Sequence, residues 1–177
     1  MNRRLCLSAL VAPLVAAAIL SAQESLRIVP IVDDGEVVVS FELADAYTND
    51  VREAISSGLR TTFTYDVELR MVGSFWVDRT IATVIAATSD QYDNLTRRHN
   101  LTRTVDGRVE GVLVTADESI ARQWLTTFAR LPLYQTSKLD SGRDYYVRIR
   151  ARSRPNSGSL LGWANDITGR AKFTFIP

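Results

Sequence analysis

Residues 62–71 alternate strictly between apolar and polar side chains, and they constrain the fold more than any other feature of the sequence. The apolar members of this alternation are Phe63, Tyr65, Val67, Leu69 and Met71. Successive side chains of a β-strand point to opposite faces, so the segment predicts a strand with one face in a core and the other in water. The chain must therefore build a sheet with a buried side.

Other segments share this two-residue period or are rich in β-branched residues, and both patterns are typical of strands. Strands are expected at residues 26–32, 37–43, 80–88, 92–104, 108–115 and 145–153, and residues 171–176 are expected to form a final strand or a tail. Asp33-Asp34-Gly35 and Asp106-Gly107 are typical of tight turns between antiparallel strands.

Two amphipathic helices are predicted between the strands. The first follows the capping residues Thr48-Asn49-Asp50 and ends at Gly58. The second begins at the capping sequence 115–118 and ends near Arg130 and Pro132. Its apolar stripe consists of Ile120, Ala121, Trp124, Leu125 and Phe128. The predicted fold class is therefore α+β and mainly β: an antiparallel sheet or sandwich with two short-to-medium helices packed on it.

The first 22 residues have the parts of a secretory signal peptide: a basic start at Arg3 and Arg4, an apolar run and a small-residue exit at Ala22. We expect cleavage near Ala22 and a periplasmic or extracellular location; retention as a membrane anchor is the alternative. The apolar run is slightly short of the about 20 residues that span a bilayer, and no later segment could span one. The expected organisation is a signal peptide at 1–22, a single antiparallel β-rich domain at 23–154, and a loop with a tail or final strand at 155–177.

The composition of the expected mature chain excludes several function classes. Cleavage removes Arg3 and Arg4, so 19 basic residues remain against 20 acidic ones. A general nucleic-acid binder usually has a marked basic excess, so no nucleic-acid partner is expected. Cleavage also removes Cys6, the only cysteine, and with it any disulfide, thiol nucleophile or cysteine metal site.

No catalytic motif stands out, and no catalytic residue, metal ligand or cofactor is expected. The only histidine, His99, lies among arginines on a predicted strand, where a surface position is expected. Asp66 and Glu68 share the polar face of one strand, and paired carboxylates can cleave glycosides. Such carboxylates more often form ion pairs with arginines of a neighbouring strand.

One polar pattern is a candidate binding site: Arg148, Arg150, Arg152 and Arg154 lie at alternate positions of a predicted strand. Strand geometry places the four guanidinium groups on one face, with a spacing of roughly 6.6–6.8 Å. They either form ion pairs with residues such as Asp66 and Glu68 or lie on a solvated edge strand. Alternatively they bind an anionic partner, an envelope protein or an anionic lipid, since arginine pairs well with carboxylate and phosphate.

Several segments occur in the same order along the chain as in a known protein family. The matching segments are Phe41-Glu42-Leu43, residues 50–55 with Ser57-Gly58-Leu59, residues 63–70, Phe75-Trp76-Val77-Asp78, Tyr92, and Tyr146-Val147-Arg148. Taken together they resemble a family of bacterial envelope proteins known as domain of unknown function 4390 (DUF4390). This resemblance implies a secreted protein without a known activity.

Two functions remain open at this level. The first is a non-enzymatic binding or adaptor domain of the bacterial cell envelope that uses the arginine strand. The second is a carrier or hydrolase for an apolar or glycan ligand held in a β-sheet cavity. A pocket lined by Trp76, Trp124 or Tyr146 would favour the second function.

Overall fold

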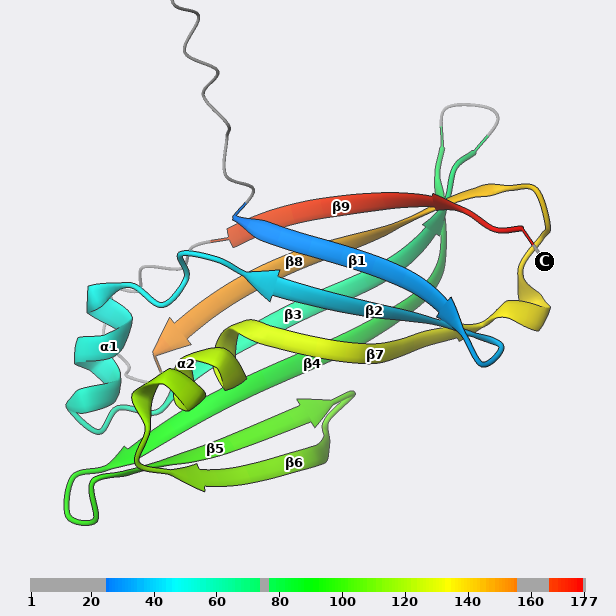
Figure 1. Ribbon diagram of the computed structural model, residues 1–177. Helices are drawn as coiled ribbons and strands as arrows, with labels where there is room; N and C mark the ends of the chain where they lie inside the picture. Colours follow the sequence, from blue (N-terminus) through cyan, green and yellow to red (C-terminus); the bar gives the residue numbers. More distant parts are fainter. Residues whose placement is uncertain (1–24, 74–76, 156–165, 177) are drawn as a thin grey trace, which may run out of the picture.

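The computed structural model describes residues 25–73, 77–155 and 166–176. Two antiparallel sheets pack face to face, and both helices lie at one end of them (Figure 1). Sheet A is formed, in order, by β1 (Leu26–Asp33), β2 (Glu36–Leu43) and β7 (Thr127–Gln135). Sheet B is formed, in order, by β6 (Arg108–Thr115), β5 (Arg98–Val105), β4 (Arg79–Asp93), β3 (Thr61–Met71), β8 (Asp144–Pro155) and β9 (Asp166–Thr174). The prediction of a mainly β, antiparallel α+β fold is confirmed.

The alternating segment forms β3, near the centre of sheet B between β4 and β8. Its apolar side chains Phe63, Tyr65, Val67 and Leu69 are fully buried, and its polar side chains are only partly exposed on the other face. Tyr65 packs against Phe41 of β2 and Phe128 of β7, with ring centroids 5.0 Å and 5.6 Å away. These three rings join the two sheets, so the core lies between them.

The first helix, α1 (Asn49–Ser56), forms where it is predicted. The hydroxyl of Thr48 accepts a hydrogen bond from the Val51 N–H at 3.3 Å, which caps the N-terminus of the helix. Gly58 has a φ of +84°, a left-handed conformation that glycine adopts at little cost, and it closes the C-terminus. Val51 and Ile55 are the residues that α1 buries.

The second helix, α2 (Glu118–Thr126), is shorter than predicted. It ends at Thr126 and not near Arg130, because the chain continues directly into β7 and pairs with β2. Phe128, predicted on the helical stripe, is therefore a strand residue whose ring packs on Phe41 at 5.1 Å. Pairing with sheet A outweighs the helical period of the local sequence.

The carbonyl groups at the end of α2 bond to side chains of sheet B. The Leu125 C=O accepts hydrogen bonds from the Tyr65 hydroxyl at 2.6 Å and from the Thr88 hydroxyl at 2.9 Å. Arg103 of β5 donates to the Trp124 C=O at 3.0 Å and to the Thr127 C=O at 2.9 Å. The last carbonyls of a helix have no partner within the helix, so these side chains make the abrupt helix-to-strand change possible.

The segment predicted as one strand over residues 92–104 is divided by a turn. Asp93 ends β4, and its carboxylate accepts hydrogen bonds from the Leu95 and Thr96 N–H groups at 2.8 Å and 3.3 Å. Arg97 completes the turn with a φ of +54°. Such local bonds from an Asp side chain to the backbone favour a turn over a continuous strand.

Residues 166–174 form β9, which pairs with β8 from Asp144↔Thr174 to Arg152↔Asp166. Its side chains alternate between exposed and partly exposed positions. Gly169 lies against β1: a Cβ at this position would come within 3.1–3.3 Å of Leu26 and Ile28 side-chain atoms. The edge strand of sheet B therefore packs against the first strand of sheet A.

Replacing Arg103 by Met tests whether this arginine stabilises the end of α2. The substitution removes two hydrogen bonds and the contacts of the guanidinium with the Trp124 and Phe128 rings, whose centroids lie at 4.5 Å and 4.3 Å. We expect the free energy of unfolding, measured in urea, to fall by about 2–4 kcal/mol. The exposed Arg108→Met control should change it by less than about 0.5 kcal/mol. Equal stability of the Arg103 variant and the wild type would contradict this role.

Candidate functional site

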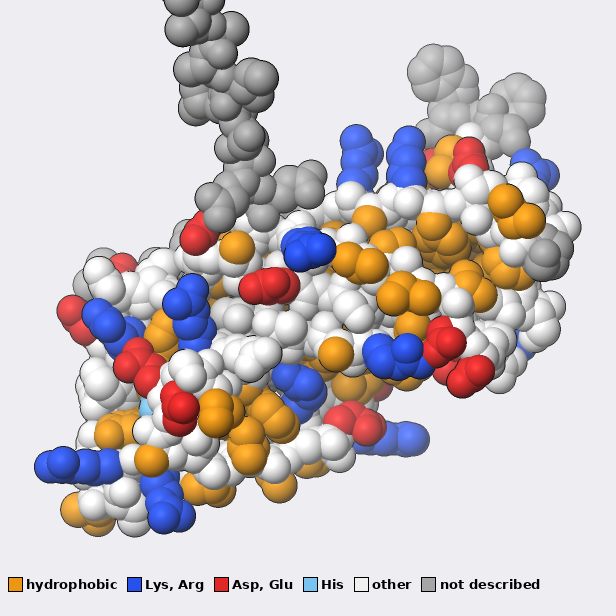
Figure 2. All heavy atoms as spheres, in the orientation of Figure 1, with side chains coloured by type: hydrophobic (Ala, Val, Ile, Leu, Met, Phe, Trp, Pro, Cys, Tyr) orange, Lys and Arg blue, Asp and Glu red, His pale blue; other side chains and the backbone are white. Residues whose placement is uncertain are grey.

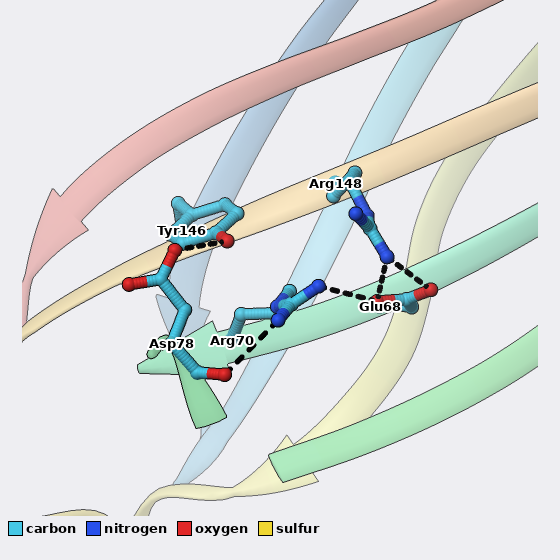
Figure 3. Close-up of polar contacts among 5 residues, drawn as sticks. All are labelled: Glu68, Arg70, Asp78, Tyr146 and Arg148. Atoms are coloured by element: carbon cyan, nitrogen blue, oxygen red, sulfur yellow. Dashed lines mark hydrogen bonds and ion pairs between the residues drawn. The ribbon is translucent and has the colours of Figure 1, made fainter. Parts of the chain in front are cut away.

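The predicted arginine strand is β8, and its outward face lies beside acidic residues of β3. Glu68 lies opposite Arg148 in the sheet register. One terminal nitrogen of Arg148 donates to both Glu68 carboxylate oxygens, at 2.8 Å and 2.7 Å (Figure 3). Arg70 approaches the same carboxylate to 3.6 Å. Glu68 therefore neutralises part of the charge that the sequence places on this face, and its hydrogen bond raises the pKa of Arg148.

The other arginines of β8 differ in their contacts. Arg152 forms an ion pair with Asp66, diagonally across the strands. Arg150 lies directly opposite Asp66 in the register, yet it is exposed and forms no ion pair with any described residue. The backbone of Arg154 belongs to β8, but its side chain lies outside the described part of the structure. Of the four predicted arginines, two are thus paired, and Arg150 is free of ion pairs within the described part of the chain.

Two further cations extend this face onto β9. Arg170 lies opposite Arg148, and Lys172 lies opposite Tyr146, so both point to the outer side of sheet B. Both are exposed and have no ion pair within the described residues. We call Arg150, Arg170 and Lys172 the basic surface. Figure 2 shows basic side chains projecting along the strand edge at the top of the molecule, where β9 runs.

The sequence analysis missed the two β9 members of the basic surface. A signal was present, because Ile167, Gly169, Ala171 and Phe173 alternate with polar residues in the same way as the residues of β3. The small side chains at 169 and 171 weaken this pattern. The pairing with β8, which brings Arg170 next to the arginine strand, is a property of the folded sheet.

Tyr146 anchors one end of the polar face. Its hydroxyl donates to the Asp78 carboxylate at 2.7 Å, and Arg70 donates to the Asp78 C=O at 3.0 Å (Figure 3). The hydrogen bonds from Tyr146 and from the Gly73 N–H lower the pKa of Asp78. Burial, followed by the hydrogen bond to Asp78, raises the pKa of Tyr146. These contacts fix the start of β4 against β3 and β8.

His99 is not the surface residue that the sequence predicts. Its side chain is buried, and its Nδ1 lies 2.6 Å from a carboxylate oxygen of the fully buried Asp90 on the neighbouring strand. The imidazole ring also packs on Tyr92, with centroids 4.8 Å apart. Burial raises the pKa of the Asp90 carboxyl, and the hydrogen bond with His99 only partly opposes this. The sequence gives no sign of this pair, because it forms across two strands.

Trp124 and Tyr146, the two described residues expected around a β-sheet cavity, do not come together. Trp124 packs over Arg103 beside α2, Tyr146 lies on the outer face of sheet B, and Trp76 lies outside the described residues. Among the residues that the structure describes, no three His, Cys, Asp or Glu side chains are grouped as a metal site. None of the described helices is long and apolar enough to cross a membrane. Residues 1–22, the expected signal peptide, also lie outside the described part.

Comparison with known proteins places the chain in a family. The family model of a domain of unknown function, DUF4390, matches residues 23–157. The protein belongs to the DUF4390 family. This confirms the resemblance seen in the sequence, and β9 of this DUF4390 protein lies beyond the matched residues. No curated protein and no solved structure matches the chain.

The Asp90–His99 pair predicts a pH-dependent difference between the wild type and Asp90→Asn. Because the folded-state pKa of Asp90 is raised, its contribution to stability is full below the ordinary value of about 3.9 and is lost as the pH rises through the folded value. We therefore expect the wild type to lose stability relative to Asp90→Asn as the pH rises above about 4. Urea unfolding of both proteins across this range measures the difference, and parallel profiles would contradict the interpretation.

The Glu68–Arg148 pair predicts a modest coupling energy. A double-mutant cycle with Glu68→Gln and Arg148→Met should give about 0.5–1 kcal/mol, because both side chains remain partly exposed, at 22% and 32%. The same cycle on Glu68 and the free Arg150 serves as the control and should give a smaller value. A zero coupling for Glu68 and Arg148 would show that their hydrogen bonds do not stabilise the sheet in solution.

Proposed function

We propose that this DUF4390 protein is a non-enzymatic binding domain of the bacterial cell envelope, and that it recognises an acidic protein partner through the basic surface. The observation that carries the proposal is a set of three exposed cations on the adjacent strands β8 and β9 that form no ion pair with any residue the structure describes. The export signal in the sequence supports the location, since residues 1–22 have the pattern of a secretory signal peptide.

The contacts around the basic surface support specific binding. Arg148 and Arg152 are held by Glu68 and Asp66, so the free cations stand beside charges whose positions are already fixed. A partner that places carboxylates against the free cations must also fit the positive and negative charges of the two neighbouring ion pairs. Electrostatic complementarity of this kind contributes to partner selection and to the rate of association.

A protein partner suits this face better than a lipid surface. The expected mature chain has about as many basic as acidic residues, and acidic side chains lie among the arginines of the face. Anionic lipids attract clusters of basic residues, at about 1 kcal/mol for each Lys or Arg. Asp66 and Glu68 already neutralise Arg152 and Arg148, so three cations remain, and the exposed Asp166 offsets one of them, which leaves little net attraction for a membrane.

In-cell crosslinking of the tagged protein tests this function. The triple variant Arg150→Ser, Arg170→Ser, Lys172→Ser should lose a protein partner that the wild type captures. With the purified partner, its affinity should fall at least about tenfold, because each exposed charge contributes about 0.5–1 kcal/mol. The matched control is Arg27→Ser, Arg108→Ser, Arg143→Ser, which removes the same charge from other exposed positions and should bind normally.

Two outcomes contradict the proposal. Equal capture by the two triple variants would remove the basic surface from the interface. Binding to vesicles that contain anionic lipid, lost only in the Arg150/Arg170/Lys172 variant and without any protein partner, would assign the surface to the membrane.

A further inference from the structure

A cleft of about 410 Å³ lies where the first turns of α1 and α2 meet. Figure 2 shows charged side chains of both signs gathered over these two helices. The cleft is lined by polar and charged side chains. They come from both helices and from the residue that precedes the N-cap of α1: Tyr47, Asn49, Arg52, Glu118, Ser119 and Arg122. The basic surface contributes none of them.

The charge in this cleft is not balanced by its own residues. Arg52 and Arg122 contribute two positive charges, and Glu118 contributes one negative charge. None of the three forms an ion pair with another described residue, and Arg52 instead donates to the Asn49 side-chain oxygen at 3.1 Å. The wall therefore carries a net positive charge that faces open space.

The two helices add to this positive field. Each presents its first turn to the cleft, where the peptide dipoles of a helix concentrate partial positive charge. The capping side chains use one backbone N–H group in the first turn of each helix. The Thr48 side chain accepts a hydrogen bond from the Val51 N–H, and the Asp117 side chain accepts one from the Ser119 N–H at 2.8 Å. The two guanidinium groups stand beside these turns, so an anion in the cleft would meet attraction from both walls.

Tyr47 adds a polar group to the wall beside Glu118. Its hydroxyl oxygen is buried. Burial raises the pKa of this hydroxyl well above its ordinary value, and the Glu118 carboxylate raises it further through its charge and through hydrogen bonding. The hydroxyl therefore remains a neutral donor next to the one carboxylate among the residues that line the cleft.

We infer that this cleft binds a small polar molecule with one oxyanion group, a carboxylate or a phosphate, and a hydroxyl or amino donor. Arg52 and Arg122 are placed to hold the oxyanion, because guanidinium groups pair well with both kinds of oxyanion. Glu118 is the acceptor for the donor group of the ligand. The volume of the cleft is near the lower end of small-molecule sites, which favours a compact ligand.

Titration of the ¹⁵N-labelled protein with lactate and, separately, with glycerol 3-phosphate tests the inference by NMR. Each probe carries an oxyanion and a hydroxyl group. We expect saturable shifts of the backbone amides of Asn49, Asp50, Glu118 and Ser119 with at least one probe, and a dissociation constant of about 1 mM or tighter. The probe that binds identifies the oxyanion.

The variant Arg52→Ser, Arg122→Ser should bind that probe at least about tenfold more weakly, whereas Arg98→Ser, Arg108→Ser should bind as the wild type does. All four substituted arginines are exposed, so both variants should remain folded and give a well-dispersed NMR spectrum. The absence of saturable shifts with both probes would overturn the inference, as would equal affinity of the two variants. This test does not involve the basic surface, so its outcome is independent of the partner proposed above.

Discussion

The fold depends on how the chain passes from α2 into sheet A without an intervening loop. The last carbonyls of a helix need partners, and here Tyr65, Thr88 and Arg103 provide them from three neighbouring strands of sheet B. The same contacts place Phe128 directly after the helix, where its ring meets Phe41 and Tyr65 in the core. Sheet B therefore satisfies the end of α2 and also fixes the first residues of β7, which completes sheet A. Replacing Tyr65, Thr88 or Arg103 would therefore remove a hydrogen bond from the carbonyls of this connection.

The outer face of sheet B shows how one strand can carry several like charges. Glu68 and Asp66 of β3 compensate two arginines of β8, and their partly buried hydrogen bonds hold those side chains in defined positions. Arg150 has no ion pair within the described residues, and β9 adds two more such cations, Arg170 and Lys172, but only one carboxylate, Asp166, which lies opposite Arg152. The face thus divides into a neutralised region over β3 and β8 and a positive region towards β9. The second region is the one that can attract an anionic group.

Much of the fold could be predicted from the sequence, because the period of β3 and the turns at Asp34-Gly35 and Asp106-Gly107 are local signals. Errors arose where distant contacts decide the structure. The second helix is predicted to end near Arg130, but residues 127–130 belong to β7 and pair with β2. Residues 94–97 turn because Asp93 bonds to the backbone. The candidate sites show the same division. The alternation of arginines indicated one strand of the basic surface, whereas Asp90–His99 depends on the pairing of two strands and the cleft joins residues of two helices far apart in the sequence.

The position of β9 separates binding preference from the stability of the core, two properties that usually change together in a small protein. The strand buries no side chain completely, although it pairs along nine positions of β8. Its outward cations Arg170 and Lys172 are exposed, so they can be exchanged at little cost to the stability of the core. A binding preference that resides on such a strand can diversify while the rest of the domain stays the same. The exposed side of β9 is also a practical place to graft new recognition groups onto this scaffold.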